Sequence, residues 1–453
     1  MNAFFVICGL GVFSLLAEVF NLKKWTTLVS IVGLAVASYL VYMQWAATSY
    51  HYHGMVYFDH FALAFSALIF VTAIFWFLMS RSYFADPEHR SDKSALVLFV
   101  VIGAILMVSF NNMAILFLGV EILSISLYVL AGSNKQSLFS TEAAFKYFLM
   151  GSFATGFLLF GMTLVYGTTG SFSLTAIADF IVSRPPIPRY FFIGMLLMMI
   201  GLAFKISAVP FHQWAPDVYE GSPTPITALM STVVKIAAFG AFIKIFSVAF
   251  GAYSNSLIIY QQGIMVLTLV VANVTAVYQT NVKRMLAYSS VGQVGYLLLG
   301  FSSNANAASG TIFYYLLSYV VASIMAFTVI QIVEKKKGNA NIENFKGLLK
   351  SNPLLGVAMT IAMFSLAGIP PFAGFFGKYL VFNLAINNGF VWATVLAAIT
   401  SLVGVYYYFK PIIAMSQSSD SVLAVDRTEN LLLVVLIALN LAVGIFPSFF
   451  QVI

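Results

Sequence analysis

Apolar runs long enough to cross a lipid bilayer recur from one end of this 453-residue chain to the other. A bilayer core of about 30 Å needs about 20 apolar residues in a helix. Nothing the size of an ordinary soluble domain fits between the runs, so they predict one fold class, an all-α polytopic membrane protein. Composition agrees, because only 8% of the residues are charged, against about 25% in soluble domains.

The apolar runs predict fourteen spans, and the basic residues of the loops test that number. We expect the spans at residues 3–20, 26–47, 58–80, 94–110, 112–131, 143–168, 190–209, 223–246, 256–279, 285–302, 309–333, 353–387, 389–413 and 429–448. Loops on the cytoplasmic side of a membrane are enriched in Lys and Arg. With both termini outside, sixteen basic residues fall inside and three outside, the three being Arg184, Arg189 and Lys244.

Charge and cysteine content exclude several classes of function. The net charge of +7 does not indicate nucleic-acid binding, because the Lys and Arg residues sit in short loops between apolar runs. Met1 to Phe20 has neither a basic leader nor a small-residue cleavage site, so we expect a retained first helix. Cys8 is the one cysteine, which excludes an intrachain disulfide and an iron–sulfur cluster ligated by this chain alone.

Prolines interrupt two of the predicted spans. Residues 190–222 contain Pro210 and Pro216, and residues 353–387 contain the pair Pro370 and Pro371. Proline removes a helical hydrogen bond and clashes with the preceding turn, so both helices should break within or near the bilayer. Irregular backbone at that depth is tolerated where it lines a polar cavity.

The two breaks are similar in sequence, which predicts an internal repeat. Phe204-Lys-Ile-Ser-Ala-Val-Pro-Phe211 resembles Phe364-Ser-Leu-Ala-Gly-Ile-Pro-Pro-Phe372 at an offset of 160 residues. The breaks are five spans apart, and an odd separation predicts two five-helix inverted repeats, each with a broken helix. Chance similarity is the alternative. We divide the chain into three N-terminal spans (1–92), a first repeat (93–250), a second repeat (251–413) and a last span (414–453).

Four charged residues lie inside the apolar spans, namely Glu121, Lys205, Lys235 and Lys378. Each costs about 2.5–3.5 kcal/mol at mid-membrane and needs a partner, water or a function. A low dielectric disfavours the charged forms of amines and carboxylates, which suits both to a proton relay. The alternative is a set of structural ion pairs or amines that reach the interface, as we expect for Lys244 and Lys410, with Glu142 and Lys146 as an i,i+4 pair.

Histidines offer weaker candidates. His212 follows the first break with Asp217 and Glu220 nearby, and it either passes protons towards the inside or caps a re-entry loop. His51, His53 and His60 flank an outer loop, where we favour solvated histidines over a metal site. Gly-x-Ser-x-Gly, His-Glu-x-x-His and Gly-x-Gly-x-x-Gly motifs are absent from the sequence. We therefore expect neither a metal nor a cofactor bound by this chain.

Three stretches of the chain resemble one family. Residues 121–132, 204–227 and 281–292 are similar to the antiporter-like membrane subunits of complex I, which are related to subunits of multisubunit sodium/proton antiporters. The resemblance extends over roughly the whole chain. Within the family, residues 216–225 and the lysine at position 378 are more similar to the subunit N branch than to subunits L or M.

The resemblance implies a proton-translocating subunit of respiratory NADH:quinone oxidoreductase, a translocase with no redox chemistry in this chain. Glu121 and Lys205 would be the ion pair of the first half-channel, Lys235 the connecting lysine and Lys378 the exit lysine of the second half-channel. Related subunits often have histidine where this chain has Gln293. Water or Lys283 would then replace that titratable step, with His212 as a further accessory group.

The resemblance also implies partners and location. NADH, FMN, iron–sulfur clusters and quinone would be held by partner subunits, with the antiporter-like subunit M and the small subunits K and J as neighbours in the bacterial inner membrane. Two rivals stay open. One is a subunit of a multisubunit cation/proton antiporter, and the other is a membrane scaffold whose buried charges have no transport role.

Overall fold

Helices make up almost all of the computed structural model, which describes residues 2–46, 50–84, 90–184, 186–303, 308–418 and 423–450. The strands β1 (Tyr50–Tyr52) and β2 (Val56–Phe58) form one antiparallel hairpin. The helices are α1 (Asn2–Leu16), α2 (Thr26–Gln44), α3 (His60–Met79), α4 (Arg90–Ser109), α5 (Met113–Ala131), α6 (Leu138–Thr169), α7 (Leu174–Ser183), α8 (Arg189–Ile206), α9 (Trp214–Gly221), α10 (Thr224–Ser231), α11 (Val233–Lys244), α12 (Ser254–Val277), α13 (Val282–Ser303), α14 (Ala308–Lys337), α15 (Leu348–Ser351), α16 (Pro353–Ala367), α17 (Ala373–Asn387), α18 (Val391–Ser416) and α19 (Arg427–Ile445).

The chain is an all-α polytopic membrane protein, as predicted. Every predicted span coincides with one helix or with a pair of consecutive helices. Within the described ranges, eleven helical stretches are long and apolar enough to cross a membrane. The three other predicted spans are the 15-residue α1, the α13 helix with two basic residues in its first turn, and the broken pair α16–α17.

The sequence did not predict the β1–β2 hairpin or the short helices α7, α9 and α15. The helices α7 and α9 have ten and eight residues, which is too short for a search that relies on membrane-length apolar runs. The helix α9 occupies part of the stretch for which a re-entry loop was one alternative.

By their internal contacts the described residues form two compact units. Unit 1 consists of residues 2–206 and 233–259, and unit 2 consists of residues 207–232 and 260–450. The segment 207–232, with α9 and α10, belongs to the second unit. The flanking helices α8 and α11 belong to the first. The inverted repeats themselves stay a prediction.

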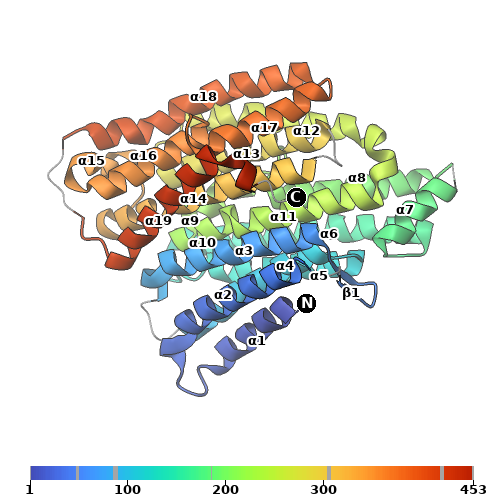
Figure 1. The fold of residues 1–453 in the computed structure, drawn as a ribbon, viewed down its shortest axis with the longest axis horizontal. Coiled ribbons are helices and arrows are strands. Elements are labelled where there is room, and N and C mark those ends of the chain that lie inside the picture. The colour runs from blue at the N-terminus through green and yellow to red at the C-terminus, as the bar shows by residue number, and fades with distance from the viewer. Residues whose placement is uncertain are drawn as a thin grey trace. The chain divides into compact units, whose positions relative to one another are not determined.

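In unit 1, α1, α2, α3 and α4 pack side by side (Figure 1). The helix α11 packs against α3, α4 and α8, and every one of its residues is buried. Large apolar side chains are exposed on α2 and α6, among them Tyr42, Phe145 and Phe153. Such faces suit lipid, because a bilayer requires apolar side chains on the outside.

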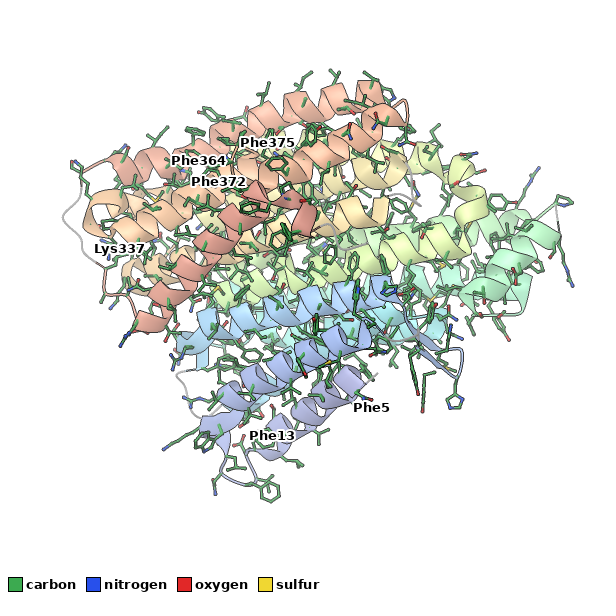
Figure 2. The ribbon with its side chains drawn as sticks, in the orientation of Figure 1. Phe5, Phe13, Lys337, Phe364, Phe372 and Phe375 are labelled. Atoms are coloured by element: carbon green, nitrogen blue, oxygen red, sulfur yellow. The ribbon has the colours of Figure 1, made fainter. Side chains whose placement is uncertain are left out.

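In unit 2, the long helix α14 is largely buried and packs against α10, α13, α16, α17 and α19. The helices α16, α17 and α18 lie together (Figure 1). Figure 2 shows Phe364, Phe372 and Phe375 gathered where α16 gives way to α17. The rings of Phe364 and Phe372 are 6.0 Å apart between centroids, so aromatic packing covers one side of this break.

Candidate functional site

The first break begins where α8 ends at Ile206. Ser207 takes the left-handed conformation (φ +62°), the Val209–Pro210 peptide bond is cis, and α9 starts at Trp214. The backbone amide of Val209 donates to Thr268 Oγ1 of α12 at 3.0 Å, which replaces a hydrogen bond that the helix can no longer make. The predicted break at Pro210 is confirmed.

Lys205 lies one residue before that helix end and is buried within unit 1. Its amine donates to Ser124 Oγ of α5 at 2.5 Å and lies 5.9 Å from the ring centroids of Tyr128 and Tyr147. The expected ion pair with Glu121 is not formed, since no salt bridge within 4 Å joins the two among the described residues. The reason is local, because Ser124, one turn along α5, is the acceptor of the amine.

Glu121 nevertheless belongs to the same site. Its Oε1 is buried and has no hydrogen-bond partner in the described structure. A buried polar atom without a partner costs about 1–3 kcal/mol, and its acceptor is one helical turn from the serine that binds the Lys205 amine. A small movement of that amine from Ser124 would supply the missing partner.

Lys235 binds the end of the broken helix. It stands in the first turn of α11, is buried, and donates from Nζ to the Ile206 carbonyl oxygen at 3.0 Å. The last carbonyls of a helix have no partner within it and carry partial negative charge. A cation at this position therefore stabilises the end of α8, and the amine is held one residue from Lys205.

The second break has the same construction. The helix α16 ends at Ala367, Gly368 takes the left-handed conformation (φ +87°), the Pro370–Pro371 peptide bond is cis, and α17 starts at Ala373. Gly368 and Ile369 both donate from their backbone amides to Phe364 O at 3.0 Å, which closes the helix with a common glycine cap.

The structural register of the two breaks is 161 residues, which corrects the predicted offset of 160. At 161 the helix ends Ile206 and Ala367 align, and so do the left-handed residues that follow them. The sequence match paired Pro210 with Pro370, although Pro210 corresponds to Pro371 in the structure. A doubled proline hid this one-residue shift.

Lys378 occupies the second break. Its buried amine donates to Ala367 O and to Ser401 Oγ of α18, both at 2.8 Å, and lies 4.7 Å from the centroid of the Tyr296 ring. The amine thus takes the end carbonyl of α16 as Lys235 takes that of α8. A Cβ on Gly368 would come within 2.8 Å of the Lys378 side chain, so this glycine also leaves room for the lysine.

Gln293 of α13 is the centre of a hydroxyl network beside this break. Its amide nitrogen donates to Leu366 O and to Tyr408 Oη at 3.0 Å each, and its oxygen accepts from the Tyr315 hydroxyl. Both N–H groups of the amide are used, and a carboxamide does not titrate, so Gln293 cannot carry a proton. A small cavity, with room for about one water molecule, is lined by Gln293, Tyr315, Ser365 and Lys378.

The accessory candidates Lys283 and His212 are not brought to that network. Lys283 is buried ten residues before Gln293 on α13 and donates to Ser222 O at 2.8 Å and Glu334 Oε1 at 3.2 Å. The predicted partners of His212 are engaged elsewhere, because Arg284 Nη1 donates to Asp217 Oδ1 and Glu220 Oε2 at 2.8 Å each. The Nδ1 atom of His212 is buried without a partner in the described residues.

Sequence reasoning missed the neutral partners of the lysines. Ser124 and Ser401 sit in apolar helices, where serine is common and commonly bonds its own backbone. Tyr315, Tyr408 and Glu334 were also missed, since tyrosine counts as apolar and Glu334 lies near a helix end. One feature of the sequence could have indicated Ser124, because this residue lies three residues after Glu121 on the same helix face.

Two helices broken by proline, each with a buried amine on its last carbonyl, define a membrane protein of the ion-handling class. Comparison with known proteins leads to the same class. A family model described as "NADH:quinone oxidoreductase/Mrp antiporter, TM" matches residues 110–404, a range that contains both breaks and all four charged candidates.

Individual relatives narrow the assignment. NADH-quinone oxidoreductase subunit N of Cytophaga hutchinsonii is 45% identical over 456 residues, which cover 99% of this chain and 98% of the relative. The protein of the same name from Flavobacterium johnsoniae is 42% identical, with coverage of 99% and 98%. This chain belongs to the NADH-quinone oxidoreductase subunit N family. A chain in the structure titled respiratory complex I from Thermus thermophilus with bound aureothin has a TM-score of 0.86, 31% identity, and coverage of 99% and 98%.

Proposed function

We propose that this chain is a proton-translocating membrane subunit of a bacterial NADH:quinone oxidoreductase. The observation that carries the proposal is the set of three buried amines at the two helix breaks, Lys205 with Lys235 at the first and Lys378 at the second. Membership in the subunit N family supplies the enzyme, because the named relatives are subunits of that oxidoreductase.

The relay begins at Glu121 and Lys205. The carboxylate has a buried oxygen without a partner, and the amine is held by a serine hydroxyl one turn away. Movement of the amine to Glu121 and back gives the pair two states, each with a different affinity for protons. Lys235, whose amine is one residue further along the α8 backbone, receives the proton next.

In the second half, Gln293, Tyr315 and the water-sized cavity lie beside Lys378. Because the Gln293 amide is fully hydrogen-bonded, the proton passes through water and hydroxyl groups at this point and not through residue 293. Lys378 releases the proton outside. Each charge moved works against about 2.3 kcal/mol per 100 mV of membrane potential.

Partner subunits and membrane location follow from membership in the subunit N family. Other membrane subunits would adjoin the chain, with subunit M and the small subunits K and J as the specific neighbours. NADH, FMN, iron–sulfur clusters and quinone would be bound in partner subunits. The chain would lie in the bacterial inner membrane with both termini outside, as the distribution of loop Lys and Arg predicts.

The experiment measures NADH-driven proton uptake into vesicles that carry the variants Lys205→Ala, Lys235→Ala or Lys378→Ala. Lys146→Ala is the matched control, because Lys146 is a partly exposed lysine whose ion pair with Glu142, at 2.7 Å, was predicted and is confirmed. Assembly of each complex is checked on a native gel. We expect lower uptake in the three test variants and normal uptake in the control.

Normal pumping in all three assembled variants would remove the relay and leave the scaffold alternative. The antiporter alternative is separated in wild-type vesicles. A cation/proton antiporter would exchange sodium for protons without NADH, whereas a respiratory subunit moves protons only while NADH is oxidised. Neighbouring genes for the remaining oxidoreductase subunits would give the same answer.

A further inference from the structure

Three loops close one end of unit 1. The backbone amide of Asn111 donates to Met55 O of the hairpin at 2.9 Å, Met113 N donates to Phe172 O at 2.9 Å, and Leu174 N donates to Asn111 O at 3.1 Å. These bonds connect residues 50–58, 110–113 and 171–174, which we call the loop seal. Loops joined by backbone hydrogen bonds leave few unpaired polar groups for water to enter.

One buried cation lies beneath this seal. Lys244 is the last residue of α11 and is 5% exposed. The sequence predicted an amine that reaches the interface, whereas the structure buries this amine inside unit 1. Lys244 is nine residues beyond Lys235 on the same helix, which places it about 14 Å further along the axis. Lys244 thus stands between the proposed proton site and the loop seal.

The Lys244 amine contacts a carbonyl and two aromatic rings, and Asp59 offsets part of its charge at longer range. The amine is 3.4 Å from Val108 O and 5.7 Å from the centroids of both the Tyr57 and Phe110 rings. Among the described residues, no carboxylate lies within 4 Å of it. Asp59 is the acidic residue that interacts with it over a longer distance, and the Asp59 carboxylate accepts the backbone amide of Ala62 as the cap of α3.

A carbonyl and two ring faces stabilise a cation without cancelling its charge, because they are dipoles and quadrupoles. A positive charge in a narrow, poorly hydrated region repels other cations, which is how pore-lining basic residues exclude protons and metal ions in channels. A site that only anchored α11 would need no charge here. An apolar side chain would fill the same space at lower cost.

We propose that Lys244, flanked by Tyr57 and Phe110, is a barrier that prevents cations and protons from entering unit 1 through the loop seal. The barrier makes the proton path one-sided at the first break, so that protons loaded at Lys205 and Lys235 leave only towards the second half. This role rests on the proposed function, and it concerns leakage, which is measured without NADH.

The experiment uses the assembled complex reconstituted into liposomes that contain a trapped pH-sensitive dye. A potassium diffusion potential with valinomycin drives protons in the absence of NADH. We expect Lys244→Met to raise the passive proton influx by about tenfold through loss of the like-charge barrier. Methionine has a similar length and no charge. Lys244→Arg keeps the charge and should stay as tight as wild type.

A second variant neutralises the amine without removing it. Tyr57→Glu places a carboxylate beside Lys244 and should also cause a leak. Tyr52→Glu is the matched control, because Tyr52 is exposed on the same hairpin and adds the same charge away from the amine. Tight liposomes with assembled Lys244→Met, or with Tyr57→Glu where Lys244→Met does not assemble, would overturn the barrier. Equal leaks in Tyr57→Glu and Tyr52→Glu would also overturn it.

NADH-driven uptake by the wild-type complex is recorded as a separate measurement. Absence of that uptake would contradict the proposed function, and it would not change the passive leak of Lys244→Met. The two hypotheses therefore fail independently.

Discussion

The two helix breaks use the same two contacts but distribute them differently. At the second break one amine, that of Lys378, binds both the end carbonyl of α16 and a serine hydroxyl from α18. At the first break Lys235 binds the end carbonyl of α8, and Lys205 binds a serine hydroxyl from α5. Among the described residues, the first break therefore holds two buried amines, whereas the second holds one.

The breaks also differ in how closely their halves approach. A Cβ on Gly374 would be 1.8 Å from Ser365 O, so α16 and α17 touch at a point that only glycine permits. The equivalent position at the first break, 161 residues earlier, is Gln213, whose side chain is exposed. The second break is a tight corner between α16 and α17, whereas the Gln213 position has room for a side chain.

The largest effect is expected at the tight corner. Gly374→Ala forces the Cβ into the Ser365 carbonyl and should destabilise the protein by about 3 kcal/mol or more. Gln213→Ala at the equivalent exposed position should change stability by less than about 0.5 kcal/mol. The thermal stability of the solubilised complex and its yield on a native gel measure both. Equal losses of stability in the two variants would show that both breaks are packed equally tightly.

The next prediction compares the loss of proton uptake at the break with one lysine and at the break with two. Lys378→Met removes the only lysine of the second break, and proton uptake should fall by at least about tenfold, as for loss of a proton-transfer group. Lys205→Met and Lys235→Met each leave one amine at the first break, so each should lower uptake less. A larger loss in either of these than in Lys378→Met would contradict the division of roles.

At the second break, the Gln293 amide hydrogen-bonds a carbonyl and two tyrosine hydroxyls. Gln293→Leu removes the partner of Leu366 O and of the Tyr315 hydroxyl, at a cost of about 1–3 kcal/mol, whereas Tyr408 keeps its hydrogen bond with Ser289. Uptake and stability should both decrease. Gln293→His retains a donor and an acceptor and should pump within about twofold of wild type. Full activity of Gln293→Leu would show that the amide does not position these hydroxyls.

The smallest effects are expected at the serines. Ser124→Ala removes the hydrogen-bond acceptor of Lys205 and should lower uptake about threefold, the effect of one modest hydrogen bond. Ser401→Ala leaves Lys378 on Ala367 O and should lower uptake less than about twofold. NADH-driven dye quenching resolves differences of this size. The reverse order would place the more important hydroxyl at the second break.

The membrane fold could be predicted because few alternatives satisfy its constraints. Apolar length, proline and loop charge each act locally, so Pro210 and Pro371 revealed the breaks, and loop Lys and Arg supported the number of spans. Glu121 and the three lysines were found because charge is rare within apolar spans. Lys244 was misread, since a lysine at a helix end is compatible with either exposure or burial.

Partners at long sequence separation could not be predicted. Lys205 and Ser124 are 81 residues apart, and Gln293 and Tyr408 are 115 apart. Nothing in an apolar helix with two serines says which of them will face which lysine. The family resemblance implied Glu121 as the direct partner of Lys205, whereas packing brought the amine to Ser124.

The sequence by itself determined that this chain is a helical membrane protein with two broken helices and four charged residues inside apolar spans, because solvation in lipid acts on each residue where it stands. Tertiary structure alone decided which carbonyl and which hydroxyl each amine binds, the register of 161 between the breaks, and the burial of Lys244. Those features depend on contacts between distant helices, which packing selects among many chemically equivalent partners.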